Sequence, residues 1–163
     1  MDLNRVGMFG HSGGGFATAR AMFKFPEVYK VGVSESGNHD NRFYHASWAE
    51  AYDGLFDADA ESHLSNTGLV DGLEGKLLLI HGEMDDNVTP HLTMRLVDRL
   101  IEANKDFDLL IVPGVEHGLV SREAYTTRKN WDYLVHHLMG LEPPAYRIAD
   151  VPLSPETLER ALS

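Results

Sequence analysis

The chain has 163 residues, enough for one domain with a hydrophobic core, and an ordinary globular composition. Acidic residues outnumber basic ones, 25 to 14, and the formal net charge of −11 argues against nucleic acid or an anionic membrane as a partner. The absence of cysteine excludes disulfides and thiol catalysis. No apolar stretch approaches membrane-spanning length, and the first residues lack the hydrophobic region of a signal peptide. We therefore expect a soluble chain whose compartment the sequence does not identify.

Strands and helices are predicted to alternate along the chain. Short apolar runs predict strands at residues 6–9, 29–33, 76–80 and 107–112. Helices are predicted at residues 13–25, 46–52, 58–64, 90–104 and 122–138, and apolar residues recur at helical spacing in residues 90–104. This alternation is typical of parallel strands joined by crossover helices, so the predicted fold class is α/β. The continuously apolar strands indicate a sheet covered on both faces.

A glycine-rich string, GHSGGG at residues 10–15, lies between the first predicted strand and the first predicted helix. It contains Gly-x-Ser-x-Gly, the pattern of a nucleophile elbow. Ser12 would stand on a sharp turn, where Gly10 and Gly14 avoid collisions with the strand and the helix. The helix N-terminus behind it would aim N–H groups at a developing oxyanion. The alternative is a flexible glycine-rich turn. A phosphate-binding loop is disfavoured because no Gly-Lys-Ser/Thr follows.

Two later strand-end loops offer the base and the acid that a serine nucleophile needs. HGEMDDNV at residues 81–88 offers Asp85 or Asp86, and PGVEHG at residues 113–118 offers His117. Catalytic groups of α/β sheets gather at the carboxyl ends of strands, and the order Ser, Asp, His is that of the α/β-hydrolases. We predict a Ser-Asp-His hydrolase site. The alternatives are turn-forming aspartates and a surface-loop histidine.

The remaining histidines show no spacing typical of metal ligands. His136 and His137 are adjacent on a predicted helix and point in different directions, so they cannot chelate one ion together. We therefore expect no metal and no cofactor. His11 and His81 flank the predicted site and are interpreted as hydrogen-bonded scaffold residues.

These strings resemble the catalytic domain of the prolyl oligopeptidase family, most closely its dipeptidyl-peptidase IV-like branch. The resemblance covers roughly residues 3–140 and rests on RVGMFGHSGGG, HGEMDDNV and EHG. GNHDNR at residues 37–42, leading to WAEAYDG at residues 48–54, also looks like that branch. The resemblance implies part of an α/β-hydrolase fold, with about four parallel strands flanked by helices. Residues 1–140 would be the C-terminal portion of the catalytic domain. Residues 141–163 would be a tail with a short helix starting near Ser154-Pro155-Glu156.

The resemblance also implies roles for single residues. The family's acid is the first aspartate after His-Gly-x-x, which is Asp85 here. Asn87 matches a residue that contacts the substrate's carbonyl. Two aromatic residues and a valine fall where the family builds its proline-sized specificity pocket, with ordinary core packing as the alternative: Tyr44, Trp48 and Val88.

Two departures from the family pattern shape the expected function. Proline-specific members of the branch often carry tyrosine where this chain has Gly13, and Gly13 would be left to donate its N–H to the oxyanion. Family members also carry a β-propeller and several strands before the elbow strand, and the oxyanion-hole tyrosine belongs to that part. We expect a serine peptidase that acts on peptides or small esters through an acyl-enzyme. The alternative is a weakly active or inactive α/β module that binds or oligomerises. The unpaired edge at residues 6–9 predicts a homodimer.

Overall fold

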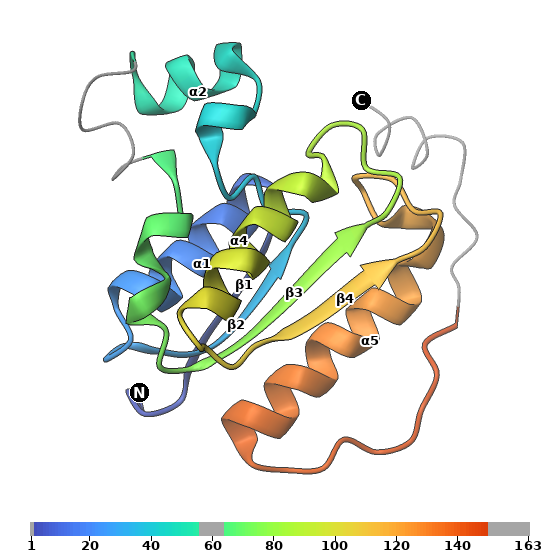
Figure 1. The fold of residues 1–163 in the computed structure, drawn as a ribbon. Coiled ribbons are helices and arrows are strands. Elements are labelled where there is room, and N and C mark those ends of the chain that lie inside the picture. Colours follow the sequence, from blue (N-terminus) through green and yellow to red (C-terminus); the bar gives the residue numbers. More distant parts are fainter. Residues whose placement is uncertain (1, 56–63, 150–163) are drawn as a thin grey trace.

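A four-stranded parallel sheet forms the centre of the protein (Figure 1). The computed structural model describes residues 2–55 and 64–149. The strands lie side by side in chain order: β1 (Val6–His11), β2 (Tyr29–Glu35), β3 (Lys76–Gly82) and β4 (Asp108–Val112). The predicted α/β class is confirmed, and each strand begins within one residue of its predicted start. The helix predicted at residues 58–64, apart from Leu64, and the terminal helix lie outside the described residues.

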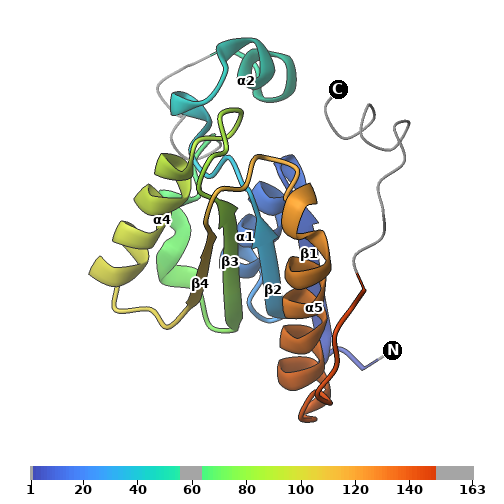
Figure 2. The ribbon, with the colours of Figure 1, turned by 90° about the vertical axis from the view of Figure 1, so that its right-hand side faces the viewer.

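Helices cover both faces of the sheet (Figures 1 and 2). One face packs against α1 (Gly13–Lys24) and α4 (Pro90–Glu102), and the other packs against α5 (Glu123–Leu134). A shorter helix, α2 (Ala46–Asp53), lies beyond the carboxyl ends of the strands. The predicted helix at residues 122–138 is divided, because α5 is followed by a π-helical turn, Val135–Met139. Short 3₁₀ helices lie at Asn41–Phe43, Thr67–Gly72 and Val120–Arg122.

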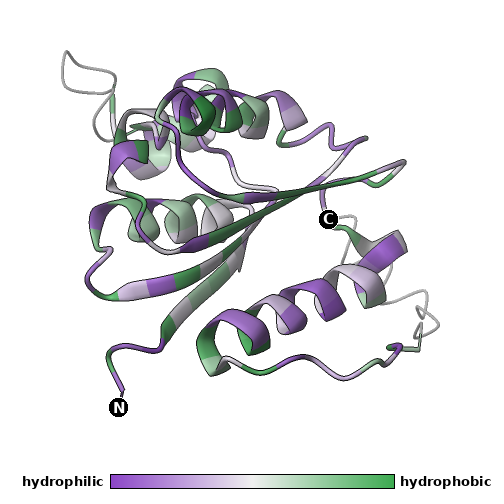
Figure 3. Ribbon diagram, turned by 60° about the horizontal axis from the view of Figure 1, so that its bottom comes forward, coloured by the Kyte–Doolittle hydropathy of each residue, from purple (hydrophilic) through white to green (hydrophobic). Residues whose placement is uncertain are grey.

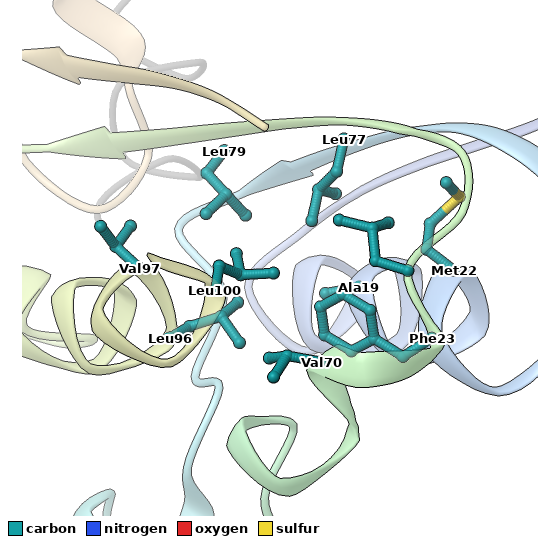
Figure 4. Packing of buried hydrophobic residues seen from close by; sticks show 10 residues of the cluster. Ala19, Met22, Phe23, Val70, Leu77, Leu79, Leu96, Val97 and Leu100 are labelled. Atoms are coloured by element: carbon teal, nitrogen blue, oxygen red, sulfur yellow. The ribbon is translucent and has the colours of Figure 1, made fainter. Parts of the chain in front are cut away.

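The alternation of side chains along β3 builds two cores, one on each face. Leu77 and Leu79 pack with residues of α1 and α4, as Figure 4 shows. Leu78 and Ile80 belong to the second core, which lies toward α5. In Figure 3 the strands are largely hydrophobic, whereas α5 carries many hydrophilic positions. A strand that is apolar at every position therefore needs cover on both faces, as the sequence predicted.

After Gly140 the chain turns and runs back along α5 (Figures 1 and 2). Gly140 has a φ of 67°, a left-handed conformation that glycine adopts without strain and that commonly ends helices. In the described parts of the chain, no helix is both long and apolar enough to cross a membrane.

Candidate active site

The turn between β1 and α1 holds Ser12 in an uncommon conformation. Its φ is 56°, in the left-handed region that non-glycine residues rarely adopt. The Ser12 N–H donates to the Glu35 carbonyl at 2.8 Å, which fixes the turn to β2. A side chain on Gly10 would collide with the Gly14 carbonyl, so glycine at that position allows the helix to start next to the strand. The same expectation for Gly14 is wrong, because a Cβ there would meet nothing within 4 Å. The geometry is that of a strained turn that holds a half-buried serine.

Three strand-end loops bring Ser12, Asp85 and His117 into contact. The Nε2 of His117 lies 3.0 Å from the Ser12 hydroxyl oxygen. The Nδ1 of the same ring lies 2.8 Å from Oδ2 of Asp85. With a proton on Nδ1 the ring donates to the carboxylate and accepts the serine proton at Nε2. In this arrangement His117 can serve as a base for Ser12 while Asp85 fixes its tautomer.

Asp85 is buried and accepts several hydrogen bonds. Its Oδ1 accepts from the backbone N–H groups of Asn87, at 3.1 Å, and Val88, at 2.8 Å. Its Oδ2 faces His81 as well as His117. Burial raises the pKa of Asp85, but the hydrogen bonds from His117, His81 and Val88 outweigh burial and hold that pKa well below its usual range. The neighbouring Asp86 is exposed. Of the two candidate acids, Asp85 therefore has the contact with His117.

His81 contacts the candidate acid Asp85 directly, a contact that the sequence did not predict. It has no exposed surface, and its Nε2 lies 2.7 Å from the Val88 carbonyl and 3.1 Å from Oδ2 of Asp85. Its Nδ1 lies 2.7 Å from the Thr93 hydroxyl. A neutral ring with its proton on Nε2 satisfies all these contacts, because the Thr93 hydroxyl can donate to Nδ1. His81 thus contacts the same carboxylate oxygen of Asp85 that faces His117.

His11 holds the backbone of His117. Its Nε2–H donates to the His117 carbonyl at 2.7 Å, and the two rings lie 4.7 Å apart between centroids. The Ser36 hydroxyl donates to the same carbonyl at 3.3 Å. Burial lowers the pKa of His11, although its hydrogen bond to the carbonyl opposes that shift. His117 is therefore fixed both at its ring and at its main chain.

Aromatic side chains lie beside the candidate nucleophile. The Tyr44 hydroxyl donates to Oδ1 of Asn87 at 2.7 Å, and the Tyr44 ring lies 5.7 Å from the ring of Trp48. A Cβ added to Gly13 would lie 3.4 Å from the Trp48 ring, so this indole lies close to the position after Ser12. Val88 differs from these residues because it has no exposed surface and its side chain packs in the interior. In the described residues, no group of three or more His, Cys, Asp or Glu side chains could hold a metal ion.

Comparison with known proteins identifies the family. The sequence model of the prolyl oligopeptidase family matches residues 1–140. The chain belongs to the prolyl oligopeptidase family. Among curated relatives in this family, dipeptidyl peptidase family member 1 of Caenorhabditis elegans is 36% identical over 136 residues, which are 82% of this chain and 17% of that protein. Human dipeptidyl peptidase 8 is 28% identical over 124 residues, 73% of this chain and 14% of that protein.

Solved structures show the same likeness. A putative dipeptidyl aminopeptidase IV from Bacteroides ovatus has a TM-score of 0.76 and 30% identity, over 84% of this chain and 20% of that one. Dipeptidyl peptidase 4 from Porphyromonas gingivalis has a TM-score of 0.78 and 26% identity, over 85% of this chain and 20% of that one. The predicted family and the partial α/β-hydrolase fold are confirmed. The chain spans a fifth or less of the length of each of these relatives.

Proposed function

We propose that this chain carries the catalytic centre of a serine hydrolase that cleaves peptide or ester bonds through an acyl-enzyme. The observation that carries the proposal is the continuous contact from Ser12 through His117 to Asp85, at 3.0 and 2.8 Å. Membership of a peptidase family supports it. In this proposal Ser12 is the nucleophile, His117 the general base and acid, and Asp85 the orienting acid.

The proposed reaction has two halves. The Ser12 oxygen attacks the substrate carbonyl while its proton moves to Nε2 of His117, and the Asp85 carboxylate stabilises the imidazolium. When the tetrahedral intermediate collapses, His117 returns the proton to the leaving amine or alcohol, and the acyl group stays on Ser12. Water then attacks the acyl-enzyme with His117 again as base. The N–H of Gly13, at the unsatisfied N-terminus of α1, is the proposed oxyanion donor.

We further propose that Tyr44, Trp48 and Asn87 line the substrate pocket. Asn87 would contact a substrate carbonyl, and its own side-chain oxygen is held by Tyr44. The Trp48 indole stands where a larger side chain at position 13 would have to pass, because even a Cβ on Gly13 reaches contact distance. Trp48 would therefore form the wall that a tyrosine at that position forms in proline-specific members. Val88 is left out of the proposed pocket, because its side chain is buried and its backbone groups bond Asp85 and His81.

A second candidate function is a binding or oligomerisation unit with little activity. One observation favours it. In the described part of the chain β1 pairs only with β2, and Phe9 on this edge strand is 64% exposed. An unpaired edge with an exposed aromatic side chain is a surface suited to association.

Labelling with a fluorophosphonate probe separates the two candidates. The probe reacts with an activated serine, so we expect labelling of the wild-type chain and its loss in Ser12→Ala. Ser121→Ala is the matched control, because it removes an exposed serine far along the chain from the elbow. Loss of labelling in Ser12→Ala alone supports the hydrolase. No labelling of a folded wild-type chain, or labelling that persists in Ser12→Ala, contradicts it.

A further inference from the structure

A cavity of about 560 Å³ lies between α5 and the segment that runs back along it. Six of its lining residues are polar or aromatic: Ser121, Arg122, Tyr125, Arg128, Tyr146 and Arg147. No described residue that lines this cavity is an aspartate or glutamate. Residues of the segment after Gly140 form one wall, and this segment lies beyond residues 1–140, the part that the family model covers. None of the candidate active-site residues Ser12, Asp85 and His117 lines this cavity.

The α5 side presents two guanidinium groups with an aromatic ring between them. Arg122, Tyr125 and Arg128 follow one another at intervals of three, which places them on one face of a helical segment. The guanidinium of Arg128 lies 5.4 Å from the centre of the Tyr125 ring. Arg128 also lies 3.4 Å from the Asp132 carboxylate, and Arg122 donates to the Ser121 carbonyl at 3.0 Å. A guanidinium has five N–H donors, so both groups keep donors for a ligand.

The charge around this cavity contrasts with the rest of the chain. The whole sequence has 14 basic and 25 acidic residues, yet three arginines line this one cavity. A second cavity, of about 500 Å³ and also lined by α5, has mixed charges that include Asp108, Lys129 and Asp132. Guanidinium groups bind carboxylates and phosphates through paired N–H donors.

We propose that this cavity binds a small organic dianion that also carries a flat apolar group. Phosphate monoesters and dicarboxylates share this chemistry. The oxyanion groups would bind the guanidiniums of Arg122, Arg128 and Arg147, and the apolar part would lie against Tyr125 and Tyr146. A volume of about 560 Å³ falls within the usual range for small-ligand sites. The proposal is independent of catalysis by Ser12.

Calorimetric titration of the whole chain at low ionic strength tests this site, because salt screens such contacts. The ligands are phenyl phosphate, phthalate and inorganic phosphate. We expect saturable binding of one organic dianion per chain, weakened at least tenfold in Arg128→Gln and in Arg122→Gln. The matched control is Arg99→Gln, which removes an exposed arginine of α4 that pairs with Glu102. It should bind like wild type.

The results also distinguish the two sources of the dianion. Tighter binding of phenyl phosphate than of phthalate assigns the site to phosphate monoesters, and the reverse order assigns it to dicarboxylates. Weaker binding of inorganic phosphate than of phenyl phosphate supports the role of the tyrosine rings. Non-saturable heats with every ligand overturn the proposal. So does binding that survives both cavity variants, or binding that falls equally in Arg99→Gln. Arg122 is exposed, so Arg122→Gln should keep the fold and the test stays valid if Arg128→Gln unfolds.

Discussion

Replacing Asp85 with asparagine tests the hydrogen bonds that its two carboxylate oxygens accept in the candidate site. Each carboxylate oxygen faces two N–H groups: Oδ1 faces the backbone of Asn87 and Val88, and Oδ2 faces His117 and His81. An amide offers one acceptor oxygen and one NH₂ donor group. In either orientation of the amide, its NH₂ group points at two other donors. The substitution is nearly isosteric, so the defect lies in hydrogen bonding and charge rather than in packing.

The expected losses follow from this geometry. A buried donor left without an acceptor costs about 1–3 kcal/mol, so two of them should lower the free energy of unfolding by about 2–6 kcal/mol. If the NH₂ group faces His117, the ring must carry its proton on Nε2, and it can no longer accept the proton of Ser12. Holding the wrong tautomer lowers kcat by about 10⁴ in serine hydrolases. We expect a loss of this order in hydrolysis and in the rate of fluorophosphonate labelling.

Asp86→Asn is the control, because Asp86 is adjacent in sequence but exposed. Its free energy of unfolding should stay within about 0.5 kcal/mol of wild type, with kcat/KM unchanged. Urea unfolding measures the stability of both variants, and steady-state hydrolysis of an activated ester measures their activity. Retention of more than about a tenth of wild-type kcat/KM in Asp85→Asn, or equal losses in both variants, would refute the role assigned to Asp85.

Four further outcomes are expected. His117→Ala should remove nearly all hydrolysis while the fold survives, and retention of more than about a tenth of kcat/KM would exclude His117 as the base. p-Nitrophenyl acetate should be cleaved faster than a dipeptidyl amide, because a good leaving group asks less of the oxyanion hole; the opposite order would contradict this. Burial lowers the pKa of His39 to about 3, so protons bind the unfolded chain first and stability should fall by about 1.4 kcal/mol per pH unit from pH 6.5 toward 3. Urea melts should show this slope reduced in His39→Gln but not in His91→Gln, which changes an exposed histidine. Sedimentation equilibrium should show a dimer, and a folded 18.2 kDa monomer at about tens of micromolar would rule out that expectation.

The strands could be predicted because their pattern is local. A run such as residues 76–80 is apolar at every position after its first lysine, and its short length between Gly75 and His81 favours a strand buried on both faces. The end of the last helix could not be predicted in the same way. The change from α-helix to a π-helical turn at Val135 depends on which carbonyl each N–H selects, and side-chain periodicity does not encode that choice.

In the candidate site, too, some residues could be predicted from local patterns and others could not. The positions of Ser12 and His117 follow from strand ends, which the sequence marks by glycine-rich loops. The residues alone left Asp85 and Asp86 as equal candidates. What distinguishes them is the path of the loop, which buries Asp85 under two backbone N–H groups and leaves Asp86 exposed. The contact of His11 with the His117 carbonyl joins positions 106 residues apart, and no local pattern records such a contact.

The three candidate residues are not held in place equally by neighbouring strands. Asp85 and His117 follow β3 and β4, and the loops after these strands are joined by the Glu83 N–H to the Val112 carbonyl, at 3.0 Å. Ser12 follows β1, which in the described part of the chain has a strand on one side only. Its N–H donates to the Glu35 carbonyl at the end of β2, which ties the strained turn to that strand. Whatever binds the open side of β1 should therefore alter the position of Ser12 more than that of Asp85 or His117. Assembly at this edge and reactivity of the serine are then linked through the same strand.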